Sequence, residues 1–400
     1  MIALSGNLLL CAFISYVLST IAFVISVTGK RWSDRSPEQH TQRWGWIGFG
    51  IAAVGFLFQT GFIITRWIAG GHFPTSNMFE FMAFLAYSII LAFIVIYLMY
   101  RMTVIGAFVM PVGIIMLAYA SVFPREIQPL IPALQSYWLK IHVTTAAIGE
   151  GAFAVGFAAG LMYLIRTVNQ EKSTKSTKWL EATLCMVLML VGFIITTMGF
   201  SSSGYEATFQ MGGSGGAPAS EVVYRMPAIA GPQDAALVTE GVMKPLFEAP
   251  SWMQGVNAGR KLNTLIWSIL TGLVLYGFIR LVTRRRLGQL MHPLVRDLDP
   301  ETIDEISYRA IAIGFPIFTL GALIFAMIWA AEAWGRFWGW DPKEVWALIT
   351  WLFYSAYLHL RLSKGWQGEK SAWMAVLGFI VVMITLVFVN LVIVGLHSYA

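Results

Sequence analysis

The sequence predicts an all-α, polytopic membrane protein of about ten transmembrane helices, with both termini on the outer side. Of its 400 residues, 57% are hydrophobic and only 12% are charged, whereas about 25% of the residues in a soluble domain are charged. The mean hydropathy of +0.68 agrees with this composition. Such a chain is expected to lie in a lipid bilayer.

Ten apolar stretches are each long enough, at about 17–25 residues, to cross the hydrocarbon core as a helix. They lie near 5–27, 44–65, 78–100, 104–121, 142–165, 183–200, 262–282, 308–330, 345–363 and 373–395. The first has no basic segment before it and no small-residue cleavage site, so it is expected to be a retained helix. The short RMTV turn predicts a tight hairpin between the third and fourth spans. The region 1–400 is interpreted as one integral membrane domain.

The positions of lysine and arginine predict the orientation. With the N-terminus outside, most of the 27 basic residues fall on the inner side, and the TRRRLGQ cluster after the seventh span is the strongest indication. This bias, together with anionic lipid headgroups, explains the net charge of +6. The expected partner is therefore the lipid bilayer, and nothing indicates nucleic acid.

The segment 201–261 is the one sizeable stretch outside the predicted spans. It is rich in Gly, Ser and Pro, which is typical of loops, and its alternation is too weak to predict strands. It is expected to be a long, outward-facing loop.

Four histidines lie at informative depths. His142 and His397 are at the outer ends of two different spans, His72 is in an outer loop, and His359 is near the inner end of the ninth span. For a single interfacial histidine, a polar tip among headgroups is the ordinary interpretation, whereas ionisable groups within a span are costly and usually functional. From Asp341 to His359 the helix rises about 27 Å at ~1.5 Å per residue. One flat ligand cannot contact His142, His397 and His359 together. If the three serve the same ligand, it must have two binding sites, an outer and an inner station.

The stretch WGRFWGWDPKE, residues 334–344, contains a predicted helix start. Asp341 can cap the helix, Pro342 suits its first position, and Glu344 can complete a capping box. Asn77 and Glu80 repeat this pattern before the third span.

Aromatic side chains are denser here than a membrane belt requires. The run 334–351 contains Trp334, Phe337, Trp338, Trp340, Trp346 and Trp351. Gly335 and Gly339 would let backbone approach a ligand, and Arg336 could pair with an anionic group. Such a surface suits a flat macrocycle such as haem. From these residues alone, a haem site and an aromatic belt with a helix cap both remain open.

The segment AEAWGRFWGWDPKEVWALITWLFYSAYLHLR, within 331–361, resembles the tryptophan-rich WWD signature of haem-handling membrane proteins. Within that superfamily the chain is similar to the CcsA/ResC-type subunit of the System II cytochrome c synthase. The motif W-G-x-x-W-x-W-D-P-K-E-x-W, then I-T-W and Y-L-H-x-R, carries the resemblance. GHFPTSNMFEF, the fifth-span IHV and the C-terminal GLHSY support it. One departure is Ala331, where the family pattern has Asn.

The resemblance implies roles for individual residues. His142 and His397 would be axial ligands of an outer haem, held against Trp334, Trp338, Trp340 and Asp341. His359 would ligate haem b at the inner station, opposite a ligand from a ResB/Ccs1-type partner subunit. His72 and Glu150 are secondary candidates, with Glu150 as a proton or polar partner or as a helix–helix contact.

The implied function is cytochrome c biogenesis in the bacterial cytoplasmic membrane or a thylakoid-type membrane. Haem would move from the inner to the outer station and be held there as reduced iron. The two thiols of a CXXCH segment of apocytochrome c would then add to its vinyl groups. No catalytic acid or base is assigned, and the chain would be one part of a holocytochrome c synthase complex.

Three other functions account for parts of the pattern. A b-type haem electron-transfer subunit would need two well-separated histidines on each of two helices, which no span has. A transporter could use the aromatic surface without haem. A CcmC-like or CcmF-like WWD protein remains the alternative within the superfamily.

Overall fold

The computed structural model describes residues 1–29, 36–127, 130, 134–211, 220–251, 253 and 257–389. They form two compact units, which are described separately. In the described chain, unit 1 comprises Met1–Glu171 and Gln289–Met383, and unit 2 comprises Lys172–Gly288 and 384–389. The interpretation of 1–400 as one integral membrane domain stays a prediction.

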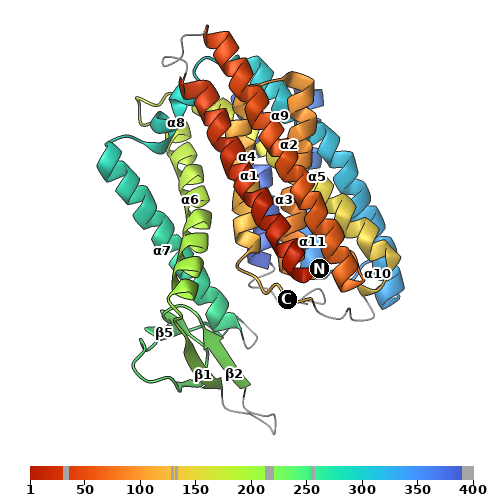
Figure 1. Ribbon diagram of the computed structural model, residues 1–400, viewed down its shortest axis with the longest axis vertical. Helices are drawn as coiled ribbons and strands as arrows, with labels where there is room; N and C mark the ends of the chain where they lie inside the picture. Colours follow the sequence, from red (N-terminus) through yellow and green to blue (C-terminus); the bar gives the residue numbers. More distant parts are fainter. Residues whose placement is uncertain are drawn as a thin grey trace. The chain divides into compact units, whose positions relative to one another are not determined.

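Unit 1 is entirely helical in its described part (Figure 1). Its helices are α1 (Ile2–Thr28), α2 (Pro37–Gly70), α3 (Met78–Tyr100), α4 (Thr103–Ala120), α5 (Tyr137–Thr167), α8 (Leu287–Val295), α9 (Pro300–Phe318), η3 (Thr319–Phe325), α10 (Ala326–Trp334), α11 (Pro342–Lys364) and α12 (Glu369–Met383). The short η3 is a π-helix, and it joins α9 to α10 in one continuous helical span. The bounds of α3 and α4 confirm the tight hairpin at RMTV.

Nine helices of the described chain are long and apolar enough to cross a membrane. This confirms an all-α polytopic membrane protein. The predicted ninth span, 345–363, does form a helix, α11, but α11 is not among these nine. The α12 span runs from Glu369 to Val387 and includes the start of η4 (Ile384–Val389).

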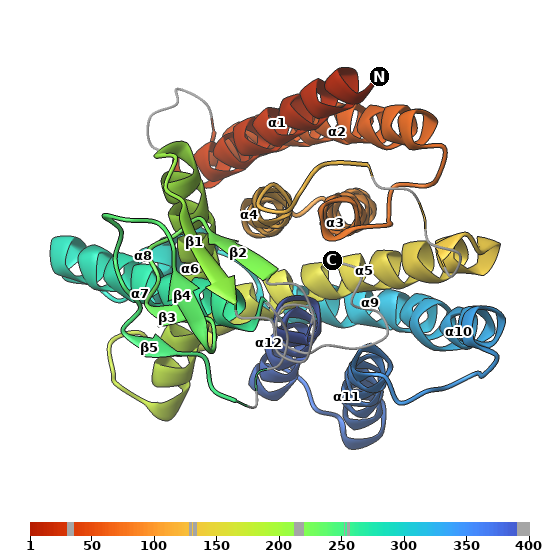
Figure 2. The same cartoon turned by 90° about the horizontal axis from the view of Figure 1, so that it is seen from below.

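The helices of unit 1 are stacked in rows (Figure 2). The α1–α2 pair forms the first row, α3 and α4 the second, α5 with α9 and α10 the third, and α11 and α12 lie beyond. The central helix is α5, whose run AAIGEGAFAVGFAAG is almost wholly buried. Small residues allow this packing. A Cβ on Gly151 would lie 2.5 Å from the carbonyl carbon of Ser88, and one on Gly149 would lie 2.7 Å from the backbone nitrogen of Phe318.

Unit 2 pairs two long helices with a small β-structure. The helices α6 (Lys175–Ser202) and α7 (Ala258–Thr283) approach closely at Gly192 and Gly272. The strands are β1 (Ala207–Met211), β2 (Ser220–Tyr224), β3 (Ala230–Gly231), β4 (Ala235–Leu237) and β5 (Phe247–Glu248). They form an antiparallel sheet of order β2-β1-β4 and a parallel β3–β5 pair.

The segment 201–261, predicted as a loop, therefore contains strands. Phe209 of β1 is paired opposite Val222 of β2, and both pack with Tyr224 in a small core. The side chain of Asn263 on α7 holds the backbone of this segment, since it accepts from Ile229 N at 2.8 Å and donates to Pro227 O at 3.0 Å. These partners lie far apart along the chain, so short-range alternation could not indicate them.

Candidate functional site

One end of unit 1 brings together most of the predicted site residues. At this end α2 finishes, α3 and α5 begin, α10 finishes and α11 begins (Figure 1, lower end of the helical bundle). It contains His72, His142 and the segment 334–341, and we call it the tryptophan end. The outward orientation of this end remains a prediction.

His142 is on the second turn of α5, where its ring is held from two directions. Its Nδ1 atom lies 2.9 Å from the carbonyl oxygen of Gly321. A carbonyl oxygen only accepts, so Nδ1 carries the proton of the neutral imidazole, and the lone pair is on Nε2. Its ring also stacks on that of Trp329, with centroids 5.7 Å apart and planes 11° apart. The imidazole is therefore oriented before any ligand arrives.

Gly321 is required for this arrangement. It lies in the π-helix η3, a rare form that is often found at functional sites. A Cβ at Gly321 would lie 2.2 Å from the backbone nitrogen of Ala146 on α5. The absence of a side chain thus lets the two backbones touch, which places the Gly321 carbonyl within reach of His142.

A stack of rings connects His142 to the tryptophan-rich segment. Trp329 lies on α10 and is 2% exposed. Its ring meets that of Trp334 edge-on, with centroids 4.7 Å apart. The predicted residues His142 and Trp334 are therefore linked through Trp329, which was not among the predicted site residues.

A tight turn connects Trp334 to α11. Gly335 ends α10 with φ of 69°, and Trp340 has φ of 57° although it is not a glycine. Asp341 accepts from Lys343 N at 3.0 Å, while Glu344 Oε2 accepts from Asp341 N at 3.2 Å and from Gly339 N at 2.7 Å. This confirms the predicted capping box. Because Glu344 also binds Gly339, the box holds the turn as well as the helix.

The tryptophans of the turn face different surroundings. Trp338 is partly buried, and its Nε1 is buried without a hydrogen-bond partner among the described residues. Trp340 is 71% exposed, and its ring meets Trp338 edge-on at 5.9 Å. A buried indole N–H without a partner is costly and indicates an acceptor supplied by something else.

Gly335 lies open, since a Cβ there would meet nothing within 4 Å, whereas Gly339 is covered. Gly335 is the left-handed residue that ends α10. The exposed side chain of Arg336 covers Gly339, with its guanidinium nitrogen 2.8 Å from where a Cβ would lie. Arg336 therefore sits over the turn with its charge directed to the surface of the tryptophan end.

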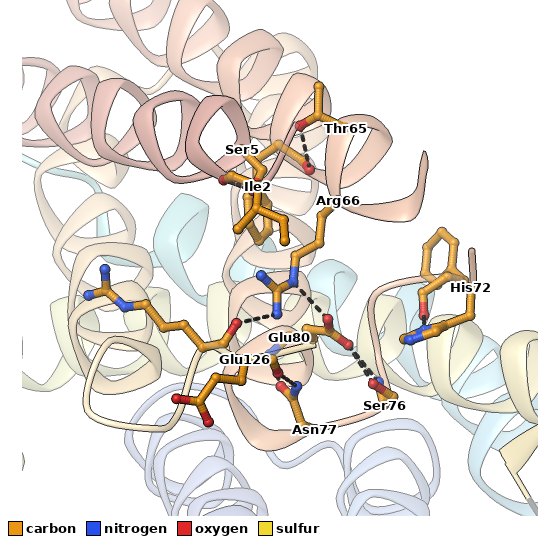
Figure 3. A network of polar contacts seen from close by, with 12 residues as sticks. Ile2, Ser5, Thr65, Arg66, His72, Ser76, Asn77, Glu80 and Glu126 are labelled. Atoms are coloured by element: carbon orange, nitrogen blue, oxygen red, sulfur yellow. Dashed lines mark hydrogen bonds and ion pairs between the residues drawn. The ribbon is translucent and has the colours of Figure 1, made fainter. Parts of the chain in front are cut away.

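His72 lies in the turn between α2 and α3, next to a buried polar network (Figure 3). Its Nδ1 is 3.2 Å from Phe73 O, and its Nε2 is buried without a hydrogen-bond partner in the described chain. The network is centred on Arg66 and Glu80, which are 3% and 1% exposed and 2.7 Å apart. Asn77 caps α3 as predicted, accepting from Glu80 N at 2.9 Å.

The carboxylate of Glu80 does not close the capping box suggested by its spacing. It binds Arg66, Ser76 N and Ser76 Oγ instead, and Arg66 also donates to Arg125 O at 2.8 Å (Figure 3). This ties the end of α2, the start of α3 and the segment before α5 together. The turn that carries His72 is thereby held in place.

The remaining candidates lie elsewhere. Glu150 is buried on α5, and its Oε2 has no hydrogen-bond partner among the described residues. His359 is exposed and lies near the C-terminal end of α11, whereas Asp341 caps the N-terminal end. His397 lies outside the described residues. Of the three predicted iron ligands, only His142 is therefore seen at the tryptophan end.

The donor set limits what metal this site could bind. Among the described residues there is no group of three or more His, Cys, Asp or Glu side chains that could hold a metal ion. A metal bound near His142 would have to bring most of its own ligands. Haem iron does so with its porphyrin nitrogens and takes only axial ligands from protein, so the residues present fit haem.

Sequence reasoning missed Gly321, Trp329 and the Arg66–Glu80 pair. Gly321 and Trp329 lie in an apolar span where nothing in the local pattern distinguishes them. Arg66 was the one available indication of the ion pair, because it is a cation directly after the second predicted span, 44–65, where a charge is costly.

Comparisons with known proteins show the family of the chain. The family described as "Cytochrome C assembly protein" matches residues 75–203 and 263–397. The chain is 33% identical over 359 residues to the cytochrome c biogenesis protein CcsA of Nostoc punctiforme, covering 88% of each chain. It is 32% identical to CcsA of Gloeobacter violaceus, covering 88% of this chain and 86% of that one. A 32% match to CcsA of a Synechococcus species covers 96% and 93%.

Proposed function

This chain belongs to the cytochrome c assembly protein family and acts in cytochrome c biogenesis; from that premise we propose that it moves haem b across the membrane and presents it for attachment to apocytochrome c. The observation that carries the proposal is the orientation of His142. Its Nδ1–H is bound by Gly321 O at 2.9 Å, which directs the Nε2 lone pair away from that carbonyl and suits it to bind iron. Ligating histidines commonly donate their other N–H in this way.

The tryptophan end would hold the macrocycle. Trp334, Trp338, Trp340 and Asp341 would form its platform and edge, and the buried Trp338 N–H would have an acceptor in the cargo. Arg336, whose charge lies at the surface of the turn, would pair with a propionate. His397 would supply the second axial ligand.

His359 would serve an inner station. It is exposed and lies at the opposite end of α11 from Asp341. The exposure of His359 supports a binding site at the surface of this subunit, where a ResB/Ccs1-type partner would supply the opposing ligand. The membrane would be the bacterial cytoplasmic membrane or a thylakoid-type membrane, with the tryptophan end facing outward.

The chemistry at the outer station is the addition of two cysteine thiols to two vinyl groups. In each addition one S–C bond forms and one vinyl C=C becomes a single bond, with the thiol hydrogen going to the neighbouring carbon. The addition itself needs no oxidant or reductant. The chain's contribution is to hold haem, as reduced iron, edge-on where the CXXCH segment can reach it, because positioning accounts for much of a bimolecular barrier.

The test is an absorption spectrum of the chain purified together with its partner subunit. We expect a Soret band that His142→Gly weakens and that added imidazole restores, because imidazole can replace the missing ligand. His292→Gly, at a histidine with no proposed ligand role, should leave the band unchanged. No Soret band in the wild type, or a full band after changing both His142 and His397 to Gly, would rule out the outer haem.

A further inference from the structure

A cavity of about 730 Å³ lies at the opposite end of unit 1 from the tryptophan end. It is lined by Pro37, Glu38, Thr41, Gln42, Trp46, Tyr97, Arg101 and Thr103. These residues come from the start of α2, the end of α3 and the start of α4. From this position we propose that the cavity binds the phosphoethanolamine headgroup of a membrane phospholipid, independently of haem.

Arg101 is the group that would bind the phosphate. Its guanidinium lies over the ring of Trp46, 4.6 Å from the centroid. Within the described part of the chain it forms no ion pair. Stacking on an indole face leaves the edge of the guanidinium plane to donate hydrogen bonds, which suits a phosphate. Thr41 and Thr103 also line the cavity, but the Thr41 hydroxyl already donates to Pro37 O at 2.9 Å, so Arg101 is the main donor to a phosphate there.

Aromatic packing holds this side of the cavity in place. Tyr97 is 3% exposed and stacks on Phe49 with centroids 4.8 Å apart. Trp46 meets both rings edge-on. Arg101 itself is the left-handed residue that ends α3, with φ of 54°. The cation is therefore presented from a rigid corner of the fold.

Glu38 decides which headgroup fits. It lines the same cavity and forms no ion pair with a described residue. One cation and one carboxylate complement a phosphate joined to an ammonium group. A primary ammonium can donate hydrogen bonds to Glu38, which a choline cannot, and a glycerol headgroup has no cation to offer.

The depth and the neighbouring surface indicate a lipid as the source of this headgroup. The cavity lies where α3 ends and α4 begins, at the end of two spans, where headgroups are found. From Trp46 an exposed apolar stripe continues along α2 through Ile47, Val54 and Leu57, which are 36%, 48% and 68% exposed. An acyl chain can lie along this stripe, whereas free phosphoethanolamine would leave it bare.

The experiment measures which lipids the purified full-length chain retains by native mass spectrometry, after exchange with phosphatidylethanolamine, phosphatidylglycerol or phosphatidylcholine. We expect the wild type to retain phosphatidylethanolamine preferentially. Arg101→Gln should lower that retention about tenfold, the effect of losing one charge-assisted hydrogen bond. Glu38→Gln should abolish the preference over phosphatidylcholine.

Arg284→Gln is the matched control, because Arg284 also ends a helix in the left-handed region, with φ of 55°. It should not change lipid retention, and all variants should keep the wild-type melting temperature in detergent. Equal retention of the three lipids by the wild type would overturn the proposal. So would equal effects of Arg101→Gln and Arg284→Gln, or competition by soluble phosphoethanolamine as strong as by the lipid.

Discussion

The Nδ1 atom of His142 lies 2.9 Å from the carbonyl oxygen of Gly321, in a π-helical turn that follows α9. This hydrogen bond joins two helices whose residues are far apart along the chain. It selects the imidazole tautomer whose Nε2 can bind a metal. The ligand character proposed for His142 therefore depends on a glycine in another span.

Gly321→Ala should disrupt that relationship. The added Cβ would lie 2.2 Å from Ala146 N, so η3 must move away from α5 and lengthen the bond to His142. We expect destabilisation of about 1–3 kcal/mol from overpacking, and about a 10–100-fold loss of haem affinity from the lost support of the ligand. The Soret absorbance per mole of purified protein measures the second effect.

Gly50→Ala is the control for that substitution, since a Cβ there would meet nothing within 4 Å although Gly50 also lies inside a helix. It should keep both the Soret band and the melting temperature. An unchanged band in Gly321→Ala would mean that haem binding does not depend on this contact.

Trp340→Gly should separate stability from function. Trp340 has φ of 57° and is 71% exposed, so its backbone is strained while its ring contributes little burial. A left-handed non-glycine residue costs about 1 kcal/mol, which glycine relieves, although the extra freedom of the unfolded chain offsets part of this. We expect an unchanged or slightly higher melting temperature together with loss of haem retention.

Arg284→Gly provides the comparison, because it relieves a similar φ of 55° in unit 2, at a residue with no proposed haem contact. It should retain haem. If Trp340→Gly also retained haem at the wild-type level, the Trp340 ring would have no part in the platform.

Glu344→Ala should loosen the turn that carries the tryptophans. Glu344 accepts from Gly339 N and Asp341 N, so its removal leaves both amides without that acceptor. Hydrogen exchange of these two amides should accelerate.

Asp299→Ala is the control, because it removes the cap of another helix, α9, where Asp299 accepts from Thr302 N at 2.9 Å. It should cost about 1 kcal/mol without altering exchange at 339 and 341. Equal exchange at those amides in the two variants would contradict the role given to Glu344.

The Arg66–Glu80 pair offers a double-mutant cycle. Both side chains are nearly fully buried and 2.7 Å apart, so changing Arg66 alone to Met leaves an uncompensated carboxylate. We expect a loss of about 3–5 kcal/mol. Changing Glu80 to Leu in the same chain should recover part of this, measured by thermal unfolding in detergent. Additive effects of the two changes would show that the pair is not coupled.

Local features of the fold could be read directly from the residues. The third span was predicted at 78–100, and α3 runs from Met78 to Tyr100. The caps at Asn77 and Asp341 form as expected. Each depends on contacts within a few residues, and the apolar length of a span depends only on composition.

Contacts between distant residues could not be read in this way. The spacing of Asn77 and Glu80 indicated a capping box, but Glu80 binds Arg66 across the helix pair instead. The strands within 201–261 depend on pairings and on Asn263 of α7. The covering of Gly339 by Arg336 likewise depends on how the turn closes.

By itself, the sequence determined the class of protein, nearly all of its spans, the start of α11 and the residue types suited to a flat iron-bearing ligand. The tertiary structure decided which of these residues contact one another and which tautomer the His142 imidazole adopts. It placed Trp329 between His142 and Trp334, and it oriented the His142 imidazole through Gly321. The physical reason is that apolar burial and capping act locally, whereas the approach of α5 to η3 depends on close backbone packing at glycines in separate spans.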